Sequence, residues 1–313
     1  MYYLDSLPRK TSAMAFVRKI ARVGLIWLSC TLVFNFVHGQ AVQLADIIRD
    51  EVIGPNEYSE LTHGNNRLFF IVWKTELWTS TPEDGNSDDT KFVKRFKSIS
   101  NLTLSGSWLY FIGDDGVSGP ELWKSNGSPD GTVKVKDIRS GAQCSNIRYL
   151  TNVYGTLYFS ANDGKHGQEL WRSNGGPKNT FMLKDILPNG GSSNPTSLTS
   201  IERTLYFSAN DGVHGYELWK SSGTTAGTVL VKDIRTEPGL SSLPDQLANV
   251  NGSLYFAALS SGKGRELWRS DGTTAGTWLV KDIRPGSIGS EIQNTTAVNR
   301  TLFFTATDGI HGH

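Results

Sequence analysis

Residues 205–234 read LYFSANDGVHGYELWKSSGTTAGTVLVKDI, and the rest of the chain repeats this stretch. Residues 254–283 read LYFAALSSGKGRELWRSDGTTAGTWLVKDI, and residues 157–186 read LYFSANDGKHGQELWRSNGGPKNTFMLKDI. The triplet Glu-Leu-Trp recurs at steps of 45, 48, 48 and 49 residues, starting at Glu76, Glu121, Glu169, Glu217 and Glu266. A fixed period of this length is the signature of a repeat architecture.

Each copy predicts four short strands. Residues 205–208 and 217–220 contain aromatic residues typical of strands, and residues 228–231 are mostly apolar and β-branched. Asn251-Gly252 joins a weaker preceding strand to Leu254, and this dipeptide between apolar runs is a strong hairpin signal. Propeller blades repeat every 40 to 50 residues or so. We therefore predict an all-β propeller of about six blades, with a β-solenoid as the alternative.

The first and last copies are irregular. In the first copy, residues 71–75 (IVWKT) replace the Asn-Asp-Gly loop, and Arg95-Phe96 replaces the usual Asp-Ile pair. The last copy reaches His313 before any Glu-Leu-Trp triplet, while residues 42–47 resemble the closing strand of a copy. We expect residues 42–47 to complete a narrow last blade. The alternative is that the sequence is a fragment of a longer protein.

The N-terminal residues 1–39 have the pattern of a secretory signal peptide. Arg18, Lys19 and Arg22 precede an apolar run, VGLIWLSCTLVF at residues 23–34, and cleavage is expected near Gly39 or Ala41. The alternative is an uncleaved anchor, but the run is shorter than the roughly 20 residues that a spanning helix needs. We expect a secreted, extracellular protein whose repeat domain is 40–313, without stable membrane insertion after cleavage.

Charge and cysteine content exclude several classes of protein. The formal net charge is +1, which gives no electrostatic footprint for nucleic acid. Cys30 lies in the predicted leader, so Cys144 is alone in the mature chain and has no internal disulfide partner. We expect Cys144 to be an inert thiol; pairing with another chain is the alternative.

The repeat resembles the ELWxxDGT-repeat family. Residues 266–273 read ELWRSDGT and match the defining motif at every fixed position, while residues 121–128 and 217–224 are near matches. The resemblance covers roughly residue 46 to the C-terminus. It implies propeller-like repeats in an exported protein, and it implies no reaction.

The recurring tryptophans are the first candidate site. One tryptophan per copy at a fixed strand position predicts packing between blades, whereas exposed aromatic residues would suggest a glycan-binding face. These residues are Trp78, Trp123, Trp171, Trp219 and Trp268.

Acidic residues recur as well. Glutamates precede the tryptophans by two residues at Glu121, Glu169, Glu217 and Glu266, and aspartates end the closing strands at Asp137, Asp185, Asp233 and Asp282. A glycosidase needs one asymmetric pair of carboxyl groups. Recurrence in every copy instead predicts structural hydrogen bonds or Lys–Asp pairs, so we predict no catalytic residues and no enzyme activity.

A short loop containing Asp and His also recurs. Residues 163–167 read DGKHG, with related loops at residues 211–215 and 308–312, and with Ser118 in place of His in residues 115–119. Each loop offers one carboxylate, far short of the six or more oxygens of a hard-cation site. We predict Asx-type turns with a hydrogen-bonding His, and no metal or cofactor.

Glycosylation sequons predict an exported glycoprotein if the host attaches glycans. The acceptor residues are Asn101, Asn126, Asn251, Asn294 and Asn299.

The function predicted from these patterns is a secreted, non-catalytic propeller that serves as an adhesion, extracellular-matrix or interaction module and binds extracellular protein or glycan. The alternative is a carbohydrate-binding protein or carbohydrate-active enzyme on the same scaffold. An enzyme would show non-repeating acids and aromatics converging at one end of the channel, so non-repeating segments such as residues 237–246 discriminate between the two.

Overall fold

The computed structural model describes residues 36–37, 40–41, 58–81 and 90–312. The chain divides into two compact units, Met1–Leu44 and Ala45–His313. In the first unit, the described residues are an antiparallel pair, β1 (Phe36–Val37) and β2 (Gln40–Ala41). Most of the predicted signal segment and all of residues 42–47 lie outside the described residues. Among those described, no helix is long and apolar enough to cross a membrane.

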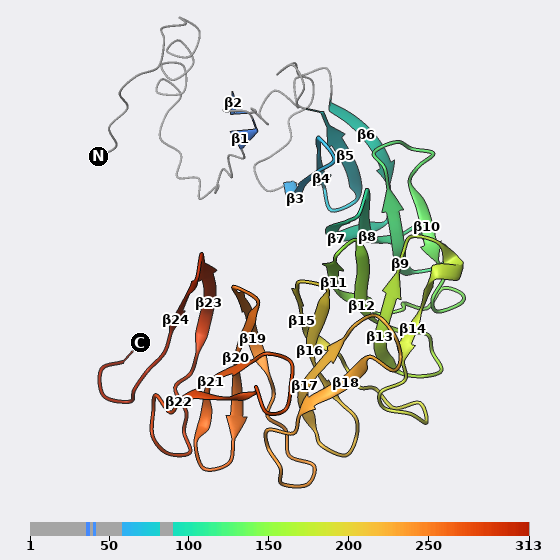
Figure 1. The fold of residues 1–313 in the computed structure, drawn as a ribbon. Coiled ribbons are helices and arrows are strands. Elements are labelled where there is room, and N and C mark those ends of the chain that lie inside the picture. The colour runs from blue at the N-terminus through green and yellow to red at the C-terminus, as the bar shows by residue number, and fades with distance from the viewer. Residues whose placement is uncertain (1–35, 38–39, 42–57, 82–89, 313) are drawn as a thin grey trace, which may run out of the picture. The chain divides into compact units, whose positions relative to one another are not determined.

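In the second unit, the described residues form five four-stranded antiparallel sheets and then a two-stranded one (Figure 1). In order, the sheets are β3 (Tyr58–Gly64), β4 (Arg67–Val72), β5 (Glu76–Ser80) and β6 (Thr90–Arg95); β7 (Ser98–Ser105), β8 (Trp108–Asp114), β9 (Pro120–Ser125) and β10 (Val133–Lys136); β11 (Arg148–Val153), β12 (Thr156–Asn162), β13 (Gln168–Ser173) and β14 (Thr180–Lys184), with the 3₁₀ turn η3 (Pro177–Asn179); β15 (Thr196–Ile201), β16 (Thr204–Asn210), β17 (Tyr216–Ser221) and β18 (Thr228–Lys232); β19 (Asp245–Val250), β20 (Ser253–Ser260), β21 (Gly264–Ser270) and β22 (Trp278–Lys281); and β23 (Gln293–Val298) with β24 (Thr301–Thr305).

Each sheet is an up-and-down meander, in which every strand pairs with its neighbour in the chain. A solenoid would instead pair each strand with the equivalent strand of the next repeat. In the described part of the chain, strands pair within their own repeat. The propeller prediction is therefore confirmed and the solenoid alternative is wrong. The described strands of the last repeat, β23 and β24, form a two-stranded blade.

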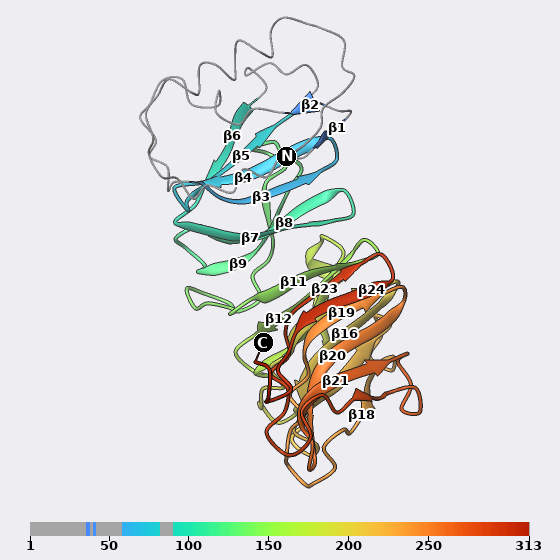
Figure 2. The same ribbon diagram turned by 90° about the vertical axis from the view of Figure 1, so that its left-hand side faces the viewer.

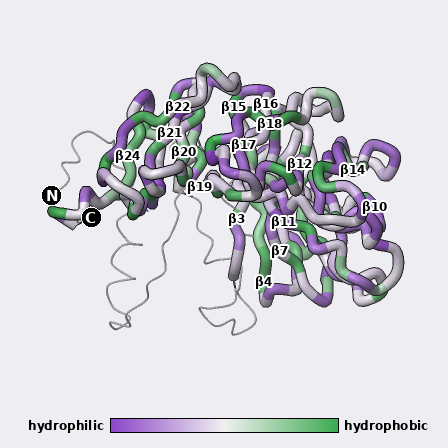
Figure 3. Tube along the Cα trace, turned by 90° about the horizontal axis from the view of Figure 1, so that it is seen from below, coloured by the Kyte–Doolittle hydropathy of each residue, from purple (hydrophilic) through white to green (hydrophobic). Residues whose placement is uncertain are grey.

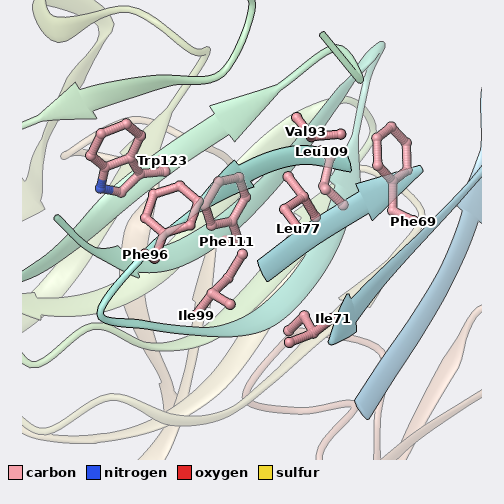
Figure 4. Close-up of a cluster of buried hydrophobic side chains, with 9 residues drawn as sticks. All are labelled: Phe69, Ile71, Leu77, Val93, Phe96, Ile99, Leu109, Phe111 and Trp123. Atoms are coloured by element: carbon pink, nitrogen blue, oxygen red, sulfur yellow. The ribbon is translucent and has the colours of Figure 1, made fainter. Parts of the chain in front are cut away.

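The core is divided among the seams between successive sheets, which pack face to face (Figure 2). The seam between the third and fourth sheets buries Leu170 and Ile186 from one side against Phe207 and Trp219 from the other. Figure 4 shows the corresponding cluster between the first two sheets, where Phe96 and Phe111 lie beside Trp123. Hydrophobic segments therefore recur along the whole unit rather than gathering in one place (Figure 3).

The turns follow the sequence signals. Asn251 and Gly252 have φ of 51° and 82°, as the two-residue hairpin between β19 and β20 requires. In the degenerate first repeat, Trp73 and Lys74 have φ of 53° and 59°, and the Thr75 N–H donates to the Val72 carbonyl at 3.1 Å. A tight hairpin thus replaces the longer loop of the other repeats.

The first strand of each sheet lies beside the first strand of the next. Contacts join β3 to β7, β7 to β11, β11 to β15, β15 to β19 and β19 to β23. These strands form the inner row of the unit. Because each sheet is a meander, the start of its first strand, the turn between its second and third strands, and the linker to the next sheet all lie at one end, called here the linker end.

Candidate functional site

The recurring tryptophans lie in the seams. Trp123, Trp171, Trp219 and Trp268 are 5–7% exposed, and each joins the hydrophobic cluster shared with the preceding sheet. Trp78, in the first sheet, is half-buried; its ring meets Phe92 edge-on at 5.7 Å, and its Nε1 donates to Glu76 at 2.9 Å. The four buried indoles offer no surface on which a sugar ring could stack.

In each of the first four sheets, a lysine near the end of the closing strand crosses to the next sheet. The Nζ of Lys184 donates to the Thr228 carbonyl at 2.8 Å and lies 5.7 Å from the centre of the Trp219 ring. Lys136 contacts Thr180 and Trp171 in the same way, and Lys232 contacts Thr277 and Trp268. Of the two predicted roles, hydrogen bonds or Lys–Asp pairs, these lysines take the first, whereas Asp282 forms an ion pair with Lys263, whose Nζ lies 3.4 Å from Asp282 Oδ2. The lysines do so because the chain continues beside a neighbouring sheet whose carbonyl and indole face bind the ammonium.

The recurring glutamates fasten each sheet to the linker that follows it. Glu217 is fully buried and accepts hydrogen bonds from the Ile234 N–H at 3.0 Å, the Ser242 N–H at 2.9 Å and the Ser242 hydroxyl at 2.5 Å. Equivalent bonds reach Glu121 from Ile138, Glu169 from Ile186 and Ser193, and Glu266 from Ile283 and Ser290. These carboxylates satisfy backbone donors that would otherwise be buried without acceptors.

Burial changes the ionisation of these glutamates. Desolvation raises the pKa of Glu121 to about 7, against the lowering effect of the hydrogen bonds from Ile138, Ser145 and Arg139. The pKa values of Glu169 and Glu217 are raised for the same reason. A raised pKa can indicate a general acid, but these carboxyl groups face backbone amides and not solvent. We therefore attribute the raised pKa values to burial within the fold and not to a catalytic role.

The Asp-His loops are closed by internal hydrogen bonds. Asp211 Oδ1 accepts from the Val213 and His214 N–H groups, both at 2.9 Å, and Asp211 Oδ2 lies 2.7 Å from His214 Nδ1. Partial burial alone would raise the pKa of Asp211, but the bonds from His214 and Val213 outweigh burial and lower it. The loops at Asp163 and Asp308 repeat this geometry. No group of three or more potential metal ligands occurs in the described residues.

The last glycine of each loop allows the loop to touch the linker. Gly215 has φ of 74°, and a Cβ placed on it would lie 2.5 Å from the Leu240 carbonyl oxygen. Any other residue would therefore clash there as well as occupy a backbone conformation that favours glycine. Gly167 and Gly264 meet their own linkers at Gly191 and Gly289 in the same way.

The remaining sequence-predicted residues lie at the surface. All five sequon acceptors, and Cys144, are exposed. Asn126 accepts hydrogen bonds from the Ser128 N–H and hydroxyl, so its side chain is engaged in the turn after β9.

Sequence reasoning missed a β-bulge near the linker end of every first strand. The ladder register shifts once in each of these strands. One residue within each shift has a left-handed backbone, with φ between 51° and 62°: Glu60, Asn101, Tyr149, Ser197, Gln246 and Asn294. This conformation costs a residue with a side chain about 1–2 kcal/mol. Glycine marks none of these positions, so the bulges could not be predicted from glycine-containing turn signals.

Polar residues that differ from sheet to sheet join the start of the third strand to the start of the first strand of the same sheet. Gln168 exchanges hydrogen bonds with Asn146, whose Nδ2 donates to Gln168 Oε1 at 3.1 Å. In the next sheet, Asn194 Nδ2 donates to the Tyr216 hydroxyl at 3.1 Å. In the fifth sheet, Arg265 forms an ion pair with Asp245. The linker end therefore differs chemically from blade to blade, although the scaffold beneath it repeats.

Comparisons with known proteins show similarity in fold at low sequence identity. No protein-family model and no curated protein matches the chain. The computationally designed Ika8 protein aligns over 80% of this chain and 68% of its own, with 13% identity and a TM-score of 0.44. A prolyl endopeptidase aligns over 80% and 46%, with 11% identity and a TM-score of 0.39. BamB from Moraxella catarrhalis aligns over 78% and 68%, with 15% identity and a TM-score of 0.41.

The chain thus spans less than half the length of the endopeptidase. These similarities are weak, and the assignment of a propeller rests on the sheet topology.

Proposed function

We propose that this chain is an exported, non-catalytic propeller that acts as an adhesion, extracellular-matrix or interaction module and binds an extracellular protein or glycan. We also propose that it is a member of the ELWxxDGT-repeat family, on the basis of the full motif at residues 266–273.

The observation that carries the proposal is that two sets of polar residues have different roles. The recurring carboxylates are used inside the fold, as Glu217 is by Ile234 and Ser242. The non-repeating polar residues gather at the linker end, as with Asn194, Tyr216 and Arg265. A scaffold that repeats its interior and varies one end is suited to recognition.

A carbohydrate-active enzyme on this scaffold is less well supported. Its two carboxyl groups would have to face a substrate. The recurring glutamates instead face backbone amides, and Asp245, at the linker end, is engaged by Arg265.

Two measurements test the proposal. The protein is expressed from its full sequence in a secreting host, and the medium is examined by N-terminal sequencing; we expect a mature N-terminus at Gln40 or Val42. The purified product is then screened on a glycan array and against immobilised extracellular-matrix proteins. A product that retains residues 23–36 and sediments with membranes, or one that binds neither class of ligand, would contradict the proposal.

A further inference from the structure

We propose that the six bulge residues form a binding site for a neutral oligosaccharide. These residues, Glu60, Asn101, Tyr149, Ser197, Gln246 and Asn294, are called the bulge set. The inference rests on the proposed function and names the ligand class and the residues that bind it.

The backbone at these positions would suit glycine better than any residue that is present. Elsewhere in its described residues the chain places both glycines, such as Gly164, and residues with side chains, such as Trp73 and Leu243, at positive φ. At the six bulges it has no glycine: a side chain is present every time, including residues such as Tyr149 and Gln246 that rarely adopt this conformation. The recurrence of a side chain at all six equivalent positions points to a role for these side chains.

The fold makes little use of those side chains. Within the described residues, the side chains of Asn101, Tyr149 and Ser197 make no hydrogen bond, and Tyr149 is 43% exposed. Gln246 Oε1 has a long contact of 3.5 Å with the Thr295 hydroxyl, and Asn294 Nδ2 donates to the Thr305 hydroxyl at 3.4 Å. The hydrogen-bonding groups of Asn101, Tyr149 and Ser197 are therefore available to a ligand.

Neighbouring bulges are close to one another. Glu60 Oε2 accepts from the Leu102 N–H at 2.7 Å, directly beside Asn101. The Gln246 carbonyl accepts from the Thr295 hydroxyl at 3.0 Å, directly beside Asn294. Successive first strands lie side by side along the whole row, so the remaining bulges lie in adjoining strands. The bulge set thus follows the inner row of strands and can contact one extended ligand.

The chemistry of the set fits a polyhydroxylated, uncharged ligand. Three residues carry amides and two carry hydroxyl groups, all of which both donate and accept, as sugar hydroxyls do. The Tyr149 ring can contact the apolar face of a sugar. The set has one carboxylate, at Glu60, and no lysine or arginine, which disfavours a sulfated or phosphorylated ligand.

Substitution by glycine separates binding from folding. Tyr149→Gly and Gln246→Gly remove the side chain while relieving the left-handed backbone, so we expect the thermal midpoint to be unchanged or higher. We expect each to weaken binding of a neutral oligosaccharide from the array about tenfold. The matched control is Tyr154→Gly, because Tyr154 has φ of 50° and is 69% exposed but lies in the turn at the other end of β11. This control should retain full affinity.

The protein for this test comes from a host without N-glycosylation, because Asn101 and Asn294 are also sequon residues. Loss of binding in both bulge variants with retained stability, and none in the control, supports the site. Wild-type protein that binds only a matrix protein or an anionic glycan, or bulge variants that bind as the parent does, would overturn the inference and leave the proposed function standing. Binding to neither array nor matrix protein would overturn both.

Discussion

The first and fourth sheets use the same glutamate in different ways. In the fourth sheet, Glu217 accepts from Ile234 and from both donors of Ser242, all in the following linker. In the first sheet, Glu76 accepts from the Trp78 indole and the Arg95 guanidinium, because Arg95-Phe96 replaces Asp-Ile and leads almost directly into β7. A buried carboxylate needs donors, and either a linker backbone or a guanidinium can supply them. The difference shows that the donors to this glutamate depend on whether a linker of several residues follows the closing strand.

The largest expected effect is on the packing of Trp219 in its seam, since its counterpart in the first sheet, Trp78, is only half-buried. Trp219→Ala should lower the free energy of unfolding by about 3–5 kcal/mol, because it opens a cavity between Leu170 and Phe207. Denaturant unfolding followed by circular dichroism measures this.

Two tryptophans serve as controls for that change. Trp108 occupies no repeat position and is partly exposed beneath the Lys124 ammonium, 4.0 Å from its ring centre, so its replacement by Ala should cost only about 1 kcal/mol. Trp78→Ala should fall between the two, because Trp78 is half-buried. Equal, small losses for all three would show that the seam indoles contribute little to packing.

The next effect compares the two glutamates directly. Glu217→Ala should cost about 3 kcal/mol, because the Ile234 and Ser242 amides are left buried without acceptors. Glu76→Ala should cost less, because the Arg95 side chain is 71% exposed and can be rehydrated. Urea midpoints of the two variants measure the difference. If Glu76→Ala proved the more damaging, the guanidinium bond would be the stronger of the two arrangements.

A pH titration tests whether ionisation of the buried carboxyl groups lowers the free energy of unfolding. The folded-state pKa of Glu121 is about 7, above its ordinary value of 4.5, so the folded state holds a proton that the unfolded state has released in that range. Stability should therefore fall as the pH rises from 5 to 8, by an amount of order 1–3 kcal/mol from this group. His214, whose pKa is raised chiefly by its hydrogen bond to Asp211, contributes in the same direction, since its stabilising charge is lost as pH rises.

The control for the titration is Glu121→Gln, which cannot ionise. Its stability should fall less steeply between pH 5 and 8 than that of the parent protein. The aspartates with lowered pKa values, such as Asp211, lose their contribution only in more acidic solution and do not affect this range. Identical slopes for variant and parent would mean that Glu121 is ionised throughout.

The repeat period and turn residues were sufficient to predict the fold. Asn251-Gly252 marks a strand end locally, and the recurrence of Trp219 at one strand position in each copy marks the repeat. The contact partner of Lys184 could not be predicted in this way, because Thr228 lies 44 residues away in the next sheet. The lysine contact depends on the neighbouring sheet, which one repeat alone does not encode. The bulges at Tyr149 and Gln246 could not be predicted either, because neither position is a glycine and the surrounding residues are typical of a strand. The bulges lie within the pairing of the first and second strands of a single sheet, where no turn residue marks them.

The smallest predicted effect concerns a loop that keeps its aspartate but lacks the histidine. In the second sheet Ser118 replaces His, and Lys134 supplies the cation instead, with its Nζ 3.3 Å from Asp115 Oδ2 and 2.5 Å from the Ser118 hydroxyl. Lys134 lies opposite Trp123 in the ladder, where the next two sheets have Met182 and Leu230 opposite their own tryptophans. Lysine is therefore present where histidine is missing.

We expect Lys134→Leu to lower the free energy of unfolding by up to about 1 kcal/mol, because Asp115 loses its charged partner in a partly exposed loop. Ser118→His on that background should restore most of the loss by recreating the loop of Asp211 and His214, whose nitrogen and oxygen are 2.7 Å apart. A double-mutant cycle of the four proteins measures the coupling. The coupling should be larger at pH 6 than at pH 8, because only protonated histidine replaces the ammonium charge. Additive effects at both pH values would mean that the two cations do not substitute for one another and that the loop is held by its backbone hydrogen bonds to Asp115 alone.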